Sequence, residues 1–306
     1  MEMRAVFGAW LDRTMAENEN VVVLDSDLAR ANGTLTLRQK YPDRALDVGI
    51  AEQNMASIAA GLASYGFVPF ISSFTPFATR RIADQVAISI SYAKQNVKIV
   101  GTDPGICAEY NGGTHMSMED VAIMRAIPGI VVVEPADAVQ LKALLPQILA
   151  YRGPVYLRLF RKEAPQLFPE ETRFDLFRAN VLREGTDITI AATGILVKEA
   201  LDAADMLVQQ GIRAEVIQFH TLKPLDEEAL LKSVKKTGKL ITAENHSLIG
   251  GLRDACAACL AANHPVPIGA IGIEDVFGEV GTLSDLQNYF GLTAEAIAKK
   301  AKEMAL

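Results

Sequence analysis

Residues 130–159, IVVVEPADAVQLKALLPQILAYRGPVYLRL, contain one complete unit of the pattern that decides the fold of this 306-residue chain. An apolar, β-branched run at 130–133 is followed by a segment of helical composition at 137–150 and by a second apolar run at 155–157. Similar apolar runs occur at 21–24, 68–71 and 97–100, and similar helical segments at 52–65, 76–94 and 117–126. Near-continuous apolar strands that alternate with helices are typical of a parallel sheet covered on both faces. The sequence therefore predicts an α/β fold.

The alternation stops after residue 160 and resumes in the second half of the chain. The stretch from Arg161 to Gly185 is charged, contains prolines and has no period, which is typical of a linker. Beyond it, apolar runs at 188–192, 214–219, 239–242 and 267–273 alternate with helical segments. We therefore expect two domains, each a mostly parallel sheet covered by helices, at residues 1–165 and 187–306, with a linker at 166–186. Ligands bind at the carboxyl ends of parallel strands, so functional residues are expected in the strand-end loops.

The composition excludes several classes of protein. The chain is 50% hydrophobic and 22% charged, and its net charge is -7. It is therefore not disordered, and it has no general attraction to nucleic acid or anionic lipid. No apolar run reaches the roughly 18–20 residues that span a bilayer, and the charged N-terminus lacks a signal-peptide core. Three cysteines are too few for a disulfide framework, so we expect a soluble cytoplasmic protein.

Three strand-end regions of the first half carry candidate functional side chains. Glu52 opens a helix of small residues, where the alternative interpretation is a first-turn acid favoured by the helix dipole. Phe74 and Phe77, at a strand end and the following helix start, either wall a flat ring or fill the core. The loop at 102–115 is long, contains glycines and ends at His115. A histidine in such a loop can exchange protons near neutral pH, and otherwise it is a surface histidine.

Other candidates have weaker signals. Arg158 and Arg161, at the end of the run at 155–157, are either anion anchors or ordinary linker charge. Cys256 and Cys259 have the spacing of a redox motif, but their alanine-rich helix favours burial. The other three histidines have no companions at metal-ligand spacing, so no metal site is expected in this chain. Neither G-x-x-x-x-G-K-[ST] nor G-x-G-x-x-G occurs.

Five motifs together resemble the C-terminal half of a transketolase. They are Asp-Val-Gly-Ile-Ala-Glu-Gln-Asn-Met at 47–55, Phe-x-x-Phe at 74–77, Gly-Gly-Thr-His at 112–115, Gly-Pro-Val-Tyr-Leu-Arg-x-x-Arg at 153–161 and Ala-Glu-Asn-His-Ser-Leu-Ile-Gly-Gly-Leu at 243–252. Each motif is weak alone, but their order and spacing are specific and extend over nearly the whole chain. The resemblance implies that residues 1–165 form a pyrimidine-binding domain and residues 187–306 a transketolase C-terminal domain, which serve thiamine diphosphate.

The resemblance implies a catalytic role for Glu52. In the family, the matching glutamate hydrogen-bonds a ring nitrogen of the cofactor's aminopyrimidine. This bond favours the imino tautomer, which takes the proton from the thiazolium carbon, and the resulting carbanion attacks the donor ketose. Such a role requires that Glu52 lies away from water with its proton available.

The resemblance assigns the remaining candidates to the cofactor and the sugar. Phe74 and Phe77 match the aromatic residues that pack against the pyrimidine, and Asp27 matches an acid near the thiazolium. His115 matches a catalytic histidine that hydrogen-bonds the terminal hydroxyl and carbonyl region of the donor. Arg161 matches an arginine that holds the acceptor's phosphate as a charge-assisted pair.

A missing motif implies a partner subunit. Transketolases hold the diphosphate and Mg²⁺ in an N-terminal domain through Gly-Asp-Gly and a downstream asparagine, and this sequence contains no Gly-Asp-Gly. We therefore expect one subunit of a split enzyme, in which a separate N-terminal subunit holds Mg²⁺ and the diphosphate and the two kinds of subunit form a heterotetramer. The assembled enzyme would transfer a two-carbon ketol unit from a ketose or ketose phosphate to an aldose or aldose phosphate. The isolated chain is expected to bind thiamine diphosphate weakly and to be inactive.

Four positions depart from the family pattern near the sugar. Asn111 stands where members often have an aspartate that recognises a sugar hydroxyl, and an amide changes the hydrogen-bond polarity there. Ala31 and Asp103 fall on two family phosphate contacts, and Asp103 would repel a phosphate beside it. Arg80 stands where an aromatic often follows the phenylalanine pair. We expect a retuned pocket, with either an unusual acceptor or a phosphate held mainly by Arg161 and the partner.

Two other interpretations stay open from the sequence. A deoxyxylulose-phosphate synthase-like or 2-oxoacid dehydrogenase beta-type protein shares the pyrimidine-binding domain and Glu52, although the first normally carries the diphosphate domain in the same chain and Gly-Gly-Thr-His is not expected in the second. A non-catalytic scaffold would keep the fold, but loss of Glu52, His115 or the phenylalanine pair would then be expected, and all are present.

Overall fold

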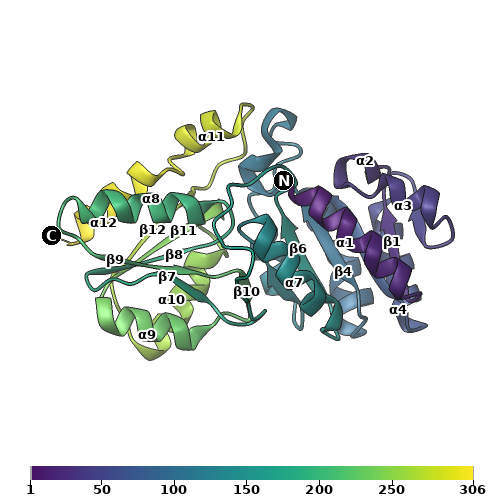
Figure 1. The fold of residues 1–306 in the computed structure, drawn as a ribbon, viewed down its shortest axis with the longest axis horizontal. Coiled ribbons are helices and arrows are strands. Elements are labelled where there is room, and N and C mark those ends of the chain that lie inside the picture. Colours follow the sequence, from purple (N-terminus) through teal and green to yellow (C-terminus); the bar gives the residue numbers. More distant parts are fainter. Residues whose placement is uncertain (1, 306) are drawn as a thin grey trace. The chain divides into compact units, whose positions relative to one another are not determined.

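The computed structural model describes residues 2–305 and divides into two compact units (Figure 1). The first unit contains the described residues up to Pro104 together with Ile123–Phe174, and the second contains Gly105–Ala122 together with the described residues from Asp175 onward. Among the described residues, no helix combines the length and the apolar character needed to cross a bilayer.

Parallel strands form the centre of the first unit. They are β1 (Val21–Asp25), β2 (Ala45–Asp47), β3 (Val68–Phe74), β4 (Lys98–Thr102), β5 (Val131–Val133) and β6 (Val155–Leu159), which lie in the order β5-β6-β4-β3-β1-β2. Every residue of β1, β4 and β6 is buried. Helices cover both faces of the sheet, which explains the near-continuous apolar runs. The α/β fold predicted for this part is confirmed.

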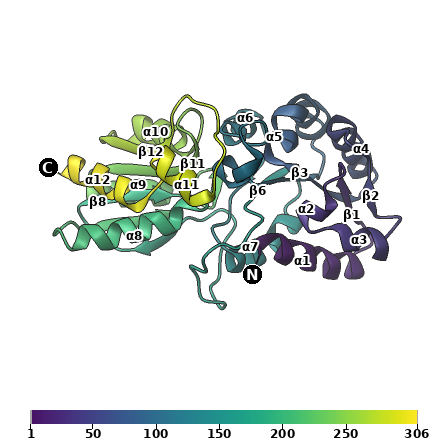
Figure 2. The ribbon, with the colours of Figure 1, turned by 90° about the horizontal axis from the view of Figure 1, so that it is seen from above.

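The helices of the first unit follow the strands in the expected alternation. They are α1 (Met3–Glu17), α2 (Ala29–Asn32), α3 (Leu35–Lys40), α4 (Glu52–Ser64), α5 (Thr75–Ala78) and α7 (Ala138–Ala150), and α6 (Asp120–Ala126) spans the junction of the two units. Figure 2 shows α1 and α7 on one face of the sheet and α4 and α5 on the other. Asp137 caps α7 by accepting a hydrogen bond from the backbone N–H of Gln140 at 2.8 Å.

The predicted helix at 76–94 is broken into three pieces. After α5 the chain forms a 3₁₀ turn, η1 (Arg80–Ile82), and then a π-helical segment, η2 (Gln85–Tyr92). Thr79, between α5 and η1, has non-helical dihedral angles (φ -131°, ψ -82°), and its Oγ1 donates to the carbonyl of Thr75 at 2.7 Å. A side chain that bonds the preceding turn competes with the helix ladder. The break fixes the direction of the two arginines that follow, Arg80 and Arg81.

The second unit contains another mostly parallel sheet. Its strands are β7 (Asn180–Arg183), β8 (Ile188–Ala192), β9 (Ala214–Gln218), β11 (Leu240–Ser247) and β12 (Ile268–Ile273), in the order β12-β11-β8-β9-β7. A short strand, β10 (Thr221–Lys223), follows β9 in the chain and is not part of this sheet. Its helices are η3 (Gly105–Asn111), α8 (Leu196–Val208), α9 (Glu227–Thr237), α10 (Leu252–Asn263), α11 (Leu283–Phe290) and α12 (Ala294–Ala305). Figure 1 shows α8 and α12 on one face of this sheet and α9 and α10 on the other.

The segment predicted as a linker at 166–186 contains a strand. β7 is the antiparallel edge strand of the second sheet and pairs with β9. Its four residues are half-buried or exposed, so it has no apolar run that would identify it in the sequence. The loop at 105–122, which precedes the strands of this sheet in the chain, also belongs to the second unit.

Two cationic side chains are buried inside the first unit. Arg158, a sequence candidate for anion binding, is fully buried in β6 and donates to Glu134 at 2.6 Å. It is therefore a structural residue, because a ligand cannot reach it. Lys98 of β4 is 1% exposed, and its Nζ donates to Asn96 Oδ1, the Tyr151 carbonyl and the Gly153 carbonyl at 2.7–2.9 Å. These bonds attach the turn after α7 to the centre of the sheet.

Burial of Lys98 makes stability depend on pH. Desolvation lowers the pKa of Lys98 from 10.5 to about 7, so above about pH 7 the unfolded chain binds more protons than the folded chain. The free energy of unfolding is therefore expected to rise with pH in this window. Relative to a Lys98→Met variant, the unmodified chain should gain about 2 kcal/mol between pH 7 and pH 9. Urea unfolding at both pH values measures the gain, and parallel curves for the two chains would contradict it.

Candidate active site

Adjacent strands of the first sheet bring candidate side chains to one edge. β3 ends at Phe74, β4 is followed by Asp103, and β6 is followed two residues later by Arg161. β6, β4 and β3 are neighbours and run parallel, so their carboxyl ends meet. The chain that follows β2 enters α4 at Glu52. The structure thus gathers these sequence-predicted residues in one unit.

Glu52 is the first residue of α4 and is almost completely buried, with 3% of its surface exposed. The N-terminus of a helix favours a negative charge, but the main partner of this carboxylate is Arg81. Nη1 of Arg81 lies 2.9 Å from both Glu52 oxygens. Glu52 is therefore a shielded carboxylate held by one cation, which the sequence analysis did not anticipate.

Phe74 and Phe77 form a half-buried aromatic pair beside this carboxylate. Their ring centroids are 6.4 Å apart and their planes are inclined by 52°. The guanidinium of Arg81 lies 3.9 Å from the centroid of Phe77, and that of Arg161 lies 5.1 Å from the centroid of Phe74. Arginine binds aromatic faces through cation–π attraction. Each ring is thus contacted by one guanidinium. Both rings are only half-buried, so neither is wholly enclosed in the core.

Arg161 and Asp103 form an ion pair at the same edge. Arg161 Nε lies 2.5 Å from Asp103 Oδ2, and the two side chains are 16% and 1% exposed. The sequence predicted that Asp103 would repel an anion placed beside it. In the structure the charge of Asp103 faces Arg161, so Asp103 both orients and partly neutralises that arginine.

Two residues at this edge have a strained backbone conformation. Four described non-glycine residues have positive φ, and two of them, Asp27 (59°) and Asp103 (53°), follow β1 and β4. Such conformations cost about 1–3 kcal/mol each and cluster at functional sites. The backbone N–H of Asp27 donates to Asp47 Oδ1 at 2.9 Å. Burial opposes ionisation of Asp47, but the N–H groups of Gly49 and Asp27 together with Arg38 hold its pKa below the ordinary value.

The loop that carries Asn111 and His115 belongs to the second unit. Asn111 is exposed and His115 is half-buried, with Nδ1 2.9 Å from Thr114 Oγ1. Asn245 fixes the start of the loop, because its Oδ1 accepts the backbone N–H of Ile106 at 3.0 Å.

Other residues of β11 support the same region. His246 Nε2 accepts the backbone N–H of Val121 at 3.1 Å, and Glu244 accepts the first N–H groups of α10, from Leu252 and Arg253, at 2.6 and 2.9 Å. The motif at 243–252 therefore positions the loop and a helix. The sequence alone did not indicate this role of the motif.

The remaining sequence candidates do not form a site. Cys256 and Cys259 are buried on α10 as unoxidised thiols, and burial raises the pKa of Cys259, which makes it unreactive. Among the described residues, no group of three or more His, Cys, Asp or Glu side chains is arranged to hold a metal ion.

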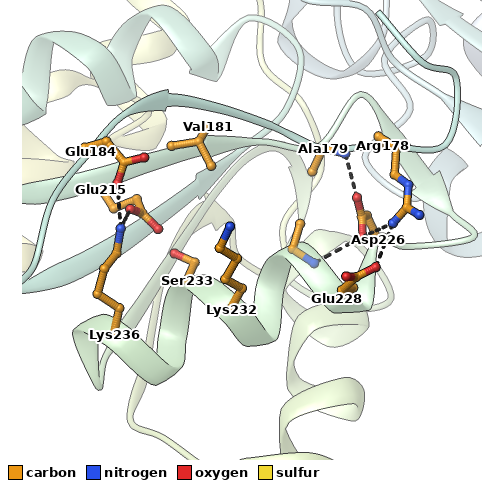
Figure 3. Close-up of a pocket in the computed structure, with 11 residues that line it drawn as sticks. Arg178, Ala179, Val181, Glu184, Glu215, Asp226, Glu228, Lys232, Ser233 and Lys236 are labelled. Carbon is orange, nitrogen blue, oxygen red and sulfur yellow. Dashed lines mark hydrogen bonds and ion pairs between the residues drawn. The ribbon is translucent and has the colours of Figure 1, made fainter.

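A cavity of about 420 Å³ lies between β7, β9 and α9 in the second unit (Figure 3). In it Lys236 pairs with Glu184 and Glu215, and Arg178 pairs with Asp226 and Glu228. Its charges thus largely neutralise one another, and it contains none of the residues that the sequence singled out.

Two family models of known proteins match this chain. Residues 1–166 match the model described as transketolase, pyrimidine binding domain, and residues 178–297 match transketolase, C-terminal domain. The chain is 56% identical over 288 residues to the 6-deoxy-6-sulfo-D-fructose transketolase subunit SqwH of Clostridium sp. (strain MSTE9). The aligned region covers 94% of this chain and 89% of that protein. It is 41% identical to the putative transketolase C-terminal section of Methanocaldococcus jannaschii, over 98% of this chain and 95% of that protein. A solved structure described as a split gene transketolase, inactive beta4 tetramer, superimposes with a TM-score of 0.90 at 40% identity, covering 99% of this chain and 97% of that chain.

Proposed function

Since this chain belongs to the transketolase family and corresponds to a subunit of a split transketolase, we propose that it performs ketol transfer at the carboxyl edge of its first sheet. The reaction would move a two-carbon ketol unit from a ketose to an aldose, with a second subunit completing the site. The observation that carries this proposal is the buried carboxylate of Glu52 at the start of α4, beside the aromatic pair of Phe74 and Phe77.

The residues at this edge fit thiamine diphosphate, the cofactor of the family. When bound, it supplies a stabilised carbanion and serves as the electron sink. Glu52 would hydrogen-bond a ring nitrogen of the aminopyrimidine away from water, and Phe74 and Phe77 would pack against its ring. The exposed carboxylate of Asp27 would lie near the positively charged thiazolium. We assign the diphosphate and Mg²⁺ to the partner, because the relatives that this chain covers almost end to end are described as a transketolase subunit and as a transketolase C-terminal section.

The substrate proposed here is a ketose that ends in a strong acid group. Arg161 is a cation at this edge that the Phe74 ring and the Asp103 carboxylate orient, and arginine suits anions such as sulfonate and phosphate. A relative that is 56% identical is described as acting on 6-deoxy-6-sulfo-D-fructose, which favours a sulfonated donor. Asn111 and His115 would bind sugar hydroxyl and carbonyl groups.

The partner is proposed to cover the exposed face of α4 and η2, which pack against each other. Ile50, Tyr65, Ile88 and Tyr92, in or next to these elements, are all more than half exposed. Gly61 lies on the exposed side of α4, and a Cβ added there would meet nothing within 4 Å. A helical glycine costs about 1 kcal/mol relative to alanine, and no packing inside this chain explains it. Close approach of a helix of the partner would explain a glycine at this position.

Reconstitution tests the proposed function. The chain would be assayed alone and with the subunit that carries the diphosphate-binding domain, using thiamine diphosphate, Mg²⁺, a sulfonated or phosphorylated ketose and an aldose acceptor. Ketol transfer is expected only from the pair, and transfer by neither preparation would contradict the proposal. Carbon dioxide release from pyruvate by the pair would instead support one of the related decarboxylating enzymes.

A further inference from the structure

Resting on the proposed function, we infer that Arg81 competes with the cofactor's aminopyrimidine and thereby sets how tightly the cofactor binds. Arg81 contacts the two groups that the proposal assigns to the pyrimidine. Its Nη1 lies 2.9 Å from both oxygens of Glu52, and its guanidinium lies 3.9 Å from the ring centroid of Phe77. A planar guanidinium that lies on that ring and donates to that carboxylate occupies both of the groups that the pyrimidine needs.

The two halves of this ion pair differ in how freely they can move. Glu52 is 3% exposed and lies in the first turn of α4, whereas the side chain of Arg81 is 42% exposed. Arg81 can therefore turn outward into water, where a guanidinium is readily solvated, while Glu52 stays in place. Arg81 is thus the member of the ion pair that the pyrimidine can displace.

Few other contacts hold Arg81. Its carbonyl accepts a bond from Gln53 Nε2 at 3.3 Å, which attaches the backbone and leaves the side chain unaffected. The structure gives its side chain only Glu52 and Phe77 as partners within the described residues. Because of the break at Thr79, Arg81 lies in the short turn η1, directed onto Glu52, a residue 29 positions earlier in the sequence. Displacing the side chain therefore costs these two contacts and leaves the rest of the turn in place.

Titration of the full chain with thiamine diphosphate tests this inference, with binding followed by ligand-observed NMR of the pyrimidine signals. The Arg81→Gln variant removes the charge but keeps a hydrogen-bond donor for Glu52, which protects folding. Its Kd should be about tenfold lower than that of the unmodified chain, because a partly exposed ion pair and a cation–π contact together are worth about that factor. Arg81→Lys keeps the charge and should stay within about threefold of the unmodified chain.

Two controls separate this inference from the proposed function. Arg152→Gln makes the same charge change at an exposed residue just before β6, at the opposite edge of the sheet, and should leave the Kd unchanged. Glu52→Ala should abolish binding. If Glu52→Ala binds like the unmodified chain, the proposed function fails. If Glu52→Ala loses binding but Arg81→Gln binds no more tightly than the unmodified chain, only the role of Arg81 is overturned.

Discussion

Replacement of Glu52 by glutamine is expected to lower the rate of ketol transfer by about 10³-fold, the middle of the range for loss of a positioned acid–base group. The amide has nearly the shape of the carboxyl group and can still hydrogen-bond the cofactor, but it cannot exchange a proton with the ring nitrogen. The burial of Glu52 means that water cannot easily replace the lost group. Cofactor affinity should therefore change far less than kcat.

A matched control makes the Glu52 result specific. Glu17→Gln carries the same chemical change at an exposed residue at the end of α1 and should keep full activity. Steady-state kinetics of the reconstituted pair, with thermal unfolding of each chain, provide the comparison. A Glu52→Gln enzyme that keeps a tenth or more of the activity would show that this carboxyl group is not the proton-transferring group.

The sequence was sufficient for the fold because parallel strands are buried on both faces. β1, β4 and β6 are buried along their whole length, and each overlaps an apolar run that could be recognised directly. β7 could not, because its side chains are half-buried or exposed and its pairing with β9 lies at a sheet edge. A strand that contributes no continuous apolar run has the same composition as a loop.

The candidate site was predicted in part. Residue type and strand-end position indicated Glu52, Phe74, Phe77 and Arg161, but nothing in the sequence indicated that Arg81 would contact Glu52. Which arginine meets Glu52 depends on the break at Thr79, and the periodic pattern at 76–94 favoured an unbroken helix instead. Likewise, the ion pair between Asp103 and Arg161 joins residues that follow two different strands, β4 and β6, so this pairing could be recognised only after the sheet order was known.

Replacement of Arg161 by methionine is expected to lower kcat/KM about 100-fold for a ketose that ends in sulfonate or phosphate. A charge-assisted hydrogen bond contributes about 1.5–3 kcal/mol, and the loss has a second component here. Asp103 is 1% exposed and faces Arg161, so removing the arginine leaves an uncompensated carboxylate that repels the incoming anion. With an uncharged ketose the same variant should stay within about threefold of the unmodified enzyme, because neither component applies.

The double variant Arg161→Met/Asp103→Asn separates the two components. If Arg161 acts through its own bond to the substrate, removing both charges restores only the part of kcat/KM that was lost to repulsion by the uncompensated Asp103 carboxylate. Most of the 100-fold loss then remains. If Arg161 serves mainly to neutralise Asp103, the double variant recovers nearly full activity. Arg152→Met provides the control for loss of one positive charge elsewhere on the same unit. Equal losses with charged and uncharged ketoses would show that Arg161 supports the structure of the site and does not recognise an anion.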